Sequence, residues 1–146
     1  MATNTAGDTG QIGYTNQTLF LRKRVTYLNL NSKGDGTGTG NATVTIGWLP
    51  PRAIVLRGST WIVTAFNDTN GDDLDVGVEG DDDDLFASAV DLNTGSTLTA
   101  FDDLADANRW STSARRVTAN FTTAPSGNGT TGEAIVMLEY IVAPSV

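Results

Sequence analysis

Nine of the chain's 17 acidic residues lie within 17 consecutive positions, from Asp68 to Asp84. Carboxylates at this density could bind a cation or act as a pair on a glycosidic bond. Calcium takes six to eight oxygens from carboxylates, amides and main-chain carbonyls, and a glycosidase needs two carboxyl groups facing each other across a cleft. A solvated acidic edge that prevents strand-to-strand aggregation is the simpler alternative.

The spacing of these acids matches a calcium loop only in part. Asp68, Asn70 and Asp72 place oxygens at alternate positions, and Glu79 follows further along. However, Asp73 stands where an EF-hand loop needs glycine, and the flanks have strand character instead of helix character. We therefore reject an EF-hand. A looser calcium site in a sandwich loop stays open, with candidate ligands Asp68, Asp72, Asp73, Asp75 and Asp81 to Asp84.

The chain lacks the residue types that most other catalytic mechanisms need. The chain has no cysteine and no histidine, so it lacks a thiolate nucleophile, a serine–histidine pair and the commonest transition-metal ligand. No aromatic-rich run accompanies the acids on one strand, which disfavours carbohydrate hydrolysis. We expect a protein that is not an enzyme, with no catalytic residues, no metal and no cofactor.

Three tryptophans are candidates for a binding surface. Trp48, Trp61 and Trp110 could stack on a sugar, as in a carbohydrate-binding module. Trp48 and Trp61 lie in alternating segments, however, which favours packing in the core or at a subunit interface.

The charge and hydropathy of the chain exclude two classes of binding partner. A net charge of −8 and a pI of about 4.2 would repel a phosphate backbone, so we expect no nucleic-acid partner. No apolar run is long enough to span a bilayer, and the polar start lacks the apolar region of a signal peptide, so we expect no membrane partner and no classical secretion. Two basic clusters, Arg22-Lys23-Arg24 and Arg115-Arg116, could still dock on an acidic protein.

The rest of the sequence predicts the strands that position these residues. The acidic segment alternates, with Leu74, Val76 and Val78 inward and acids outward, as in a strand with one wet face. A short strand and a loop carrying Trp110 are predicted within residues 96–112. Further strands are predicted over residues 18–30, 43–48, 54–66, 115–122 and 133–142. The last is apolar on both faces, so it is central in its sheet or covered on its second side.

Three local patterns predict finer detail. Val44, Ile46 and Trp48 share one face of their strand. The Asn70-Gly71 pair predicts a hairpin that joins strand 54–66 to the acidic strand. Asp81 to Asp84 precede an apolar run, and acids at the positive end of a helix dipole predict one or two helical turns over residues 83–90.

Six to eight strands and one short helix predict an all-β fold. We expect an antiparallel two-sheet sandwich, more like a jelly roll than an immunoglobulin domain. Residues 1–17, with few apolar anchors, predict a flexible or extended N-terminal arm. Residues 18–146 predict a single β-sandwich domain, because 146 residues suit one core.

The central part of the chain resembles small virion proteins of tailed bacteriophages. The resemblance rests on a proline-containing entry before a long strand, an Asn/Gly hairpin into a Val-Gly-Val-x-Gly-Asp strand, a short acidic-capped helix and the closing strand. These blocks are Gly47 to Leu56, Thr64 to Asp68, Asp75 to Asp81, Leu85 to Leu92 and Glu139-Tyr140-Ile141, within about residues 44 to 142.

In function, the chain looks like the jelly-roll decoration, or cement, proteins of phage capsids. The resemblance implies a structural protein that forms homotrimers, binds the major capsid protein on the capsid exterior and is made in the host cytoplasm. The N-terminal arm and the cluster of Arg22, Lys23 and Arg24 are candidates for docking, because arms and complementary charge commonly serve docking. Two alternatives stay open: a calcium-dependent carbohydrate-binding module, and a structural protein associated with the tail or fibre.

Overall fold

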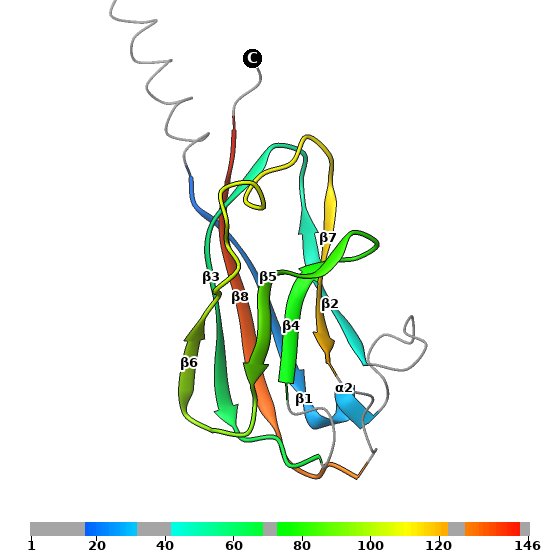
Figure 1. Cartoon of the computed structure of the whole chain (residues 1–146). Coiled ribbons are helices and arrows are strands. Elements are labelled where there is room, and N and C mark those ends of the chain that lie inside the picture. The colour runs from blue at the N-terminus through cyan, green and yellow to red at the C-terminus, as the bar shows by residue number, and fades with distance from the viewer. Residues whose placement is uncertain (1–16, 32–41, 69–72, 123–127, 144–146) are drawn as a thin grey trace, which may run out of the picture.

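The computed structural model describes residues 17–31, 42–68, 73–122 and 128–143. Within them the chain forms eight strands and one short helix (Figure 1). The elements are β1 (Leu19–Thr26), α2 (Tyr27–Asn31), β2 (Thr43–Leu49), β3 (Ala53–Thr64), β4 (Asp73–Val78), β5 (Asp82–Asp91), β6 (Thr97–Ala100), β7 (Arg115–Phe121) and β8 (Glu133–Val142). The strands form two four-stranded sheets, ordered β1-β8-β3-β6 and β2-β7-β4-β5.

The strand pairing is that of one long hairpin rolled up on itself. β1 pairs with β8, β2 with β7, β3 with β6 and β4 with β5, all antiparallel. Two more antiparallel pairs, β3 with β8 and β4 with β7, complete the sheets. Eight strands connected in this way make a jelly roll. The predicted antiparallel two-sheet sandwich is therefore confirmed.

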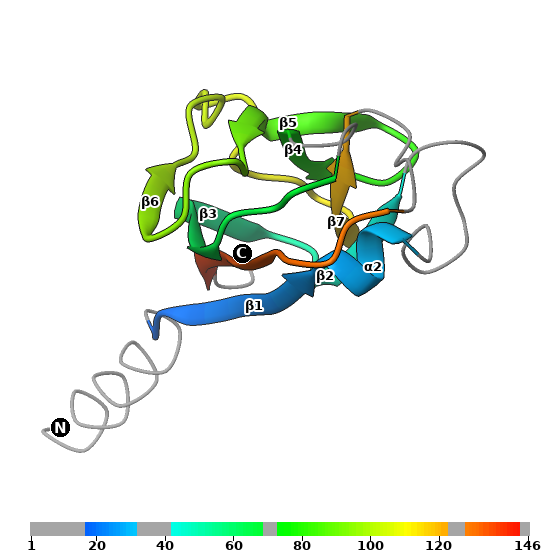
Figure 2. The same cartoon turned by 90° about the horizontal axis from the view of Figure 1, so that it is seen from below.

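The core lies between the two layers, which Figure 2 shows from below with β1 and β5 on opposite sides. It is built by strand alternation, because every second residue of a strand faces inward. β4 contributes Leu74, Val76 and Val78, as predicted. The last strand, β8, lies between β1 and β3, so its predicted central position is confirmed.

The predicted helix over residues 83–90 is wrong, because these residues belong to β5. Acids before an apolar run are a local signal, and a segment this short has little helical stability alone. Pairing with the free edge of β4 satisfies the backbone of both strands, and it buries Phe86, Ala87 and Val90. Tertiary burial thus outweighs the helix-start signal.

The short helix lies instead at α2, where the sequence predicts a continuing strand. The side-chain oxygen of Asn29 accepts hydrogen bonds from the backbone amide and the hydroxyl of Thr26, at 2.8 and 3.2 Å. A side chain that reaches back to the residue before the first turn is half of a capping box. Leu30 of this turn is fully buried and anchors it to the core.

Two further details of the sequence prediction are also wrong. β3 and β4 belong to different sheets, so the connection between them crosses the sandwich and is no hairpin. In β2, a bulge between Thr45 and Gly47 shifts the alternation by one residue. Trp48 therefore turns outward, and Leu49 takes the buried place.

Residues 1–16 of the predicted N-terminal arm lie outside the described residues, so the arm and the domain boundary at residue 18 stay predictions. Among the residues that the structure describes, no helix is long and apolar enough to cross a membrane.

Gly58 of β3 predicts a test of the core. A Cβ atom at this position would lie 2.1 Å from the ring of Phe101, which occupies the space that a side chain would need. Overpacking of this kind typically costs about 1–3 kcal/mol. We therefore expect Gly58→Ala to lower the free energy of unfolding in urea by that amount. Ser59→Ala is the control, because Ser59 is the next residue of β3 and its side chain points away from the core. A Gly58→Ala midpoint equal to that of the control would contradict the packing.

Candidate functional site

The acidic segment does not form one site. Asp68 lies beyond the end of β3 and is 5% exposed. The other described acids of the segment lie along β4, in the turn after it and at the start of β5. Asp72, another candidate ligand, lies outside the described residues. The structure thus separates Asp68 from the exposed acids, and it divides the candidate calcium ligands between two parts of the molecule.

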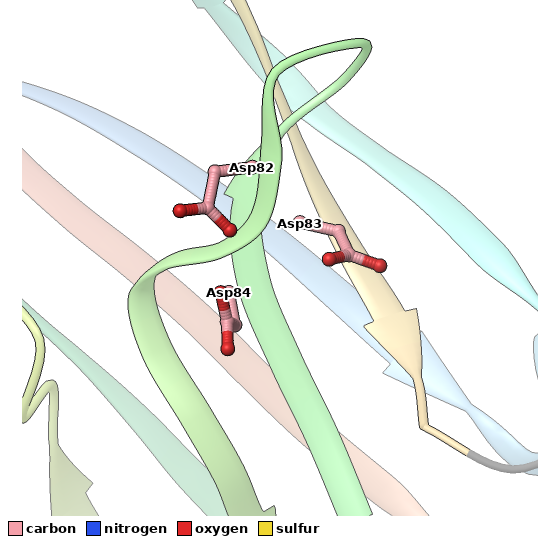
Figure 3. A group of neighbouring side chains, drawn as sticks. All are labelled: Asp82, Asp83 and Asp84. Carbon is pink, nitrogen blue, oxygen red and sulfur yellow. The ribbon is translucent and has the colours of Figure 1, made fainter.

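The exposed acids gather where β5 crosses the outer face of β4. Figure 3 shows Asp82, Asp83 and Asp84 there. One carboxylate oxygen of each lies within 4.8 Å of those of the other two. The crossing needs Gly77, because a Cβ atom there would lie 2.2 Å from the carbonyl oxygen of Asp82. Sequence alternation found the strand, but it could not show this close approach.

Two of the carboxyl groups at this crossing are shifted toward the protonated form. A hydrogen bond with Asp82 is the main cause that raises the pKa of Asp84. Burial is the main cause that raises the pKa of Asp75, and the nearby charges of Asp83 and Asp73 add to it. The amide of Ala89 opposes this shift by donating a hydrogen bond of 2.7 Å to Asp75.

This cluster supplies fewer oxygens than calcium needs. The three aspartates are the one group of neighbouring acids in the described part of the chain that could hold a metal ion, and each offers one carboxylate oxygen to it. These three oxygens compare with the six to eight that calcium takes. The geometry therefore fits a solvated acidic edge, where the carboxylates repel one another and face water.

The tryptophans are exposed, so packing of Trp48 and Trp61 in the core is wrong, whereas their packing at a subunit interface stays a prediction. Trp48, Trp61 and Trp110 are 60%, 44% and 47% exposed. Trp48 lies on the outer face of one sheet and Trp61 on that of the other. Trp110 pairs with Ile54, seven residues before Trp61 on β3, a separation of roughly 23 Å at about 3.3 Å per residue. They therefore do not form one sugar platform.

The outer face of the β1-β8-β3-β6 sheet carries the most developed surface feature. Its strand register aligns three rows of outward side chains. The rows are Arg24, Ile135, Trp61 and Leu98; then Arg22, Met137, Ser59 and Ala100; then Phe20, Glu139 and Arg57. We call this surface the outer face.

The middle row creates a hollow. Ser59 and Ala100 are small, whereas the rows on both sides carry long or aromatic side chains. The result is an open hollow of about 410 Å³ lined by Phe20, Leu98, Met137 and their neighbours. Phe20 is 65% and Leu98 66% exposed. Contiguous exposed apolar side chains in a concave site are typical of interaction surfaces.

Two arginine–glutamate pairs lie on the outer face, and the pair of Arg57 and Glu139 lines the hollow. Arg24 donates two hydrogen bonds to Glu133, at 2.7 and 2.9 Å, and Arg57 pairs with Glu139. The pairing with Arg24 lowers the pKa of Glu133. Both carboxylates of this face are therefore held by arginines, and neither is free to act as a base.

Alternation divides the predicted basic cluster. Arg22 and Arg24 lie on the outer face, opposite Met137 and Ile135. Lys23 lies opposite the buried Val136, so it starts on the inner side and reaches solvent at the sheet edge. Within the described residues, no ion pair involves Arg22 or Lys23.

Comparison with solved structures identifies chains with the same fold. One belongs to the acidic stable capsid structure of Helicobacter pylori bacteriophage KHP30, with a TM-score of 0.64, 17% identity, and 90% of this chain and 93% of that chain covered. Another belongs to the capsid of Ralstonia phage GP4, with a TM-score of 0.59, 14% identity, and 90% and 88% covered. A third belongs to the cyanophage Pam1 capsid asymmetric unit, with a TM-score of 0.57, 20% identity, and 86% and 85% covered.

At these identities the likeness establishes the fold. Neither a protein-family model nor a curated protein matches the sequence. These three chains come from phage capsids, in keeping with the resemblance that the sequence shows to phage virion proteins.

The raised pKa of Asp75 predicts how stability depends on pH. Because the folded state binds this proton more tightly than the unfolded state, the charged carboxylate destabilises the fold above its raised pKa. This cost disappears as the pH falls through that pKa. Asp75→Asn keeps an acceptor for the Ala89 amide and removes the charge. We expect it to raise the free energy of unfolding at pH 7 by roughly 0.2–1 kcal/mol.

Urea unfolding at pH 7 and at pH 5 measures both the gain and its pH dependence. The gain should be smaller at pH 5, where the wild-type carboxyl is closer to neutral. Asp102→Asn is the matched control, because Asp102 is exposed and its carboxylate also accepts a hydrogen bond from a backbone amide, that of Ser88. A loss of stability in Asp75→Asn at pH 7 would contradict the electrostatic account.

Proposed function

We propose that this chain is a structural protein of a phage virion, a cement protein that binds the outside of the capsid as a homotrimer. The observation that carries the proposal is the shared jelly roll. It extends over 86% to 90% of this chain in chains of three phage capsids. The exposed apolar outer face supports a docking role, because an isolated soluble chain gains nothing from such a surface.

The proposed mechanism is multivalent attachment. Each copy offers one modest surface to the major capsid protein. Three copies held in one trimer bind with an avidity that exceeds a single contact by roughly 10²- to 10⁴-fold. A trimer bound across a seam then links neighbouring capsid subunits and opposes the outward pressure of packaged DNA. No catalytic step is part of this role.

Arg22, Lys23 and Arg24 are the proposed docking residues. Arg22 and Arg24 share the outer face with the hollow, so the proposal gives them the main basic contacts. Lys23 points to the other side of β1 and contributes through longer-range charge. Charged residues at the rim of an interface chiefly affect the rate of association and its dependence on salt.

Capsids assembled without this chain provide the direct test. We expect the purified protein to bind them at micromolar concentration and to raise their disruption temperature in a thermal release assay. Light scattering should give the free protein a mass three times that of the 15.3 kDa chain, because the mechanism requires a trimer.

The same measurements separate the alternatives. If the protein does not bind capsids and has the mass of a monomer, the cement proposal is wrong. Binding to tails or fibres in place of capsids would favour the tail-associated alternative. A rise in Tm with millimolar calcium together with signals on a glycan array would favour the carbohydrate-binding module.

A further inference from the structure

The register of the outer face determines the shape of what can dock there. The hollow exists because Ser59 and Ala100 face each other across β3 and β6, between taller rows. Phe20 closes it on the β1 side and Leu98 on the β6 side. A flat partner surface would leave this space unfilled and would lose its packing contacts. A fitting partner must therefore project a bulky apolar side chain.

The charges around the hollow determine the chemistry beside that side chain. Arg24 and Arg57 are each paired with a glutamate of β8. Arg22, on β1, lies in the row between theirs and opposite Met137, which lines the hollow. No carboxylate of the described residues forms an ion pair with it. A guanidinium in this position favours a carboxylate from the partner, since arginine binds carboxylates with paired hydrogen bonds.

A second copy of this chain does not meet both conditions when its outer face packs against this one. In such a pair the glutamates of both faces are already held by Arg24 and Arg57. Each copy would then add another Arg22 to the interface and no free carboxylate to receive it. Like charges brought together across an interface are unfavourable.

We propose that the hollow receives one bulky apolar side chain from an acidic segment of the capsid subunit, with a carboxylate of that segment against Arg22. This assignment rests on the proposed virion function and specifies the surface and the partner chemistry. The contact is distinct from the surfaces that hold the copies of the trimer together.

Three variants test the two parts of the assignment, the apolar contact in the hollow and the carboxylate at Arg22. Leu98→Asp puts a charge on the wall of the hollow, Ala100→Trp fills the hollow, and Arg22→Glu reverses the charge beside it. All three positions are exposed, so the fold should persist, and circular dichroism and Tm check this. We expect each variant to weaken co-sedimentation with capsids at least tenfold, a loss typical of a residue that matters to an interface.

The chain offers a matched control for the change on the wall of the hollow. Leu28→Asp alters an apolar side chain of α2 that is 61% exposed, close to the 66% of Leu98. This control should bind within about twofold of the wild type, since a surface change away from the contact has little effect.

Binding and mass are measured together, so that each failure has its own signature. Weakened capsid binding at an unchanged oligomeric mass supports the assignment. Unchanged binding of the three variants overturns it and leaves the virion function intact. Dissociation of the free protein into monomers also overturns it, because the outer face would then be a contact between copies. If the wild type itself does not bind capsids, the proposed function fails and the assignment fails with it.

Discussion

The rest of the structure depends on the place of β8 between β1 and β3. β8 is the last strand of the described chain, and it pairs along its length with the first strand and with the long third strand. These pairs satisfy the backbone of three strands and close the rolled hairpin. Since one residue of slippage turns every side chain to the other face, the same register buries Ala134, Val136 and Leu138 and presents Ile135 and Met137 to solvent.

The surface follows from that register. The hollow arises from where small and large side chains fall in adjacent rows. A bulge in β3 between Val55 and Arg57 turns two successive residues, Leu56 and Arg57, outward. Arg109 stabilises this bulge by donating hydrogen bonds to the carbonyl oxygens of Val55 and Leu56. Arg57 is thereby placed beside Glu139, and three arginines share one face of a chain with a net charge of −8. The exposed acids of β4 and β5 lie on the other sheet, so the two charge clusters are separated by the core.

Sequence patterns predicted the elements whose alternation is regular, and they failed where tertiary contacts decide. Leu74, Val76 and Val78 fall inward as the period of two requires. The acids before Leu85 predicted a helix, but this segment instead pairs with β4 as a strand. The residues from Tyr27 were predicted to continue a strand, but they form a helical turn in which Asn29 accepts a hydrogen bond from the backbone of Thr26. Trp48 was misplaced because a bulge leaves no sign in alternation alone. The hollow could not be predicted from the sequence, because residues of β1, β8, β3 and β6 build it together. Only the strand order of the folded sheet brings Phe20 and Leu98 to the same hollow.

An electron cryomicroscopy map of capsids bearing this protein would test the account most directly. The account predicts a jelly roll on the capsid exterior with its β1-β8-β3-β6 sheet against a capsid subunit. An apolar side chain of that subunit should fill the space over Ser59 and Ala100, and a carboxylate should lie near Arg22. A map in which this face points to solvent, with the acidic β4–β5 edge on the capsid, would contradict it.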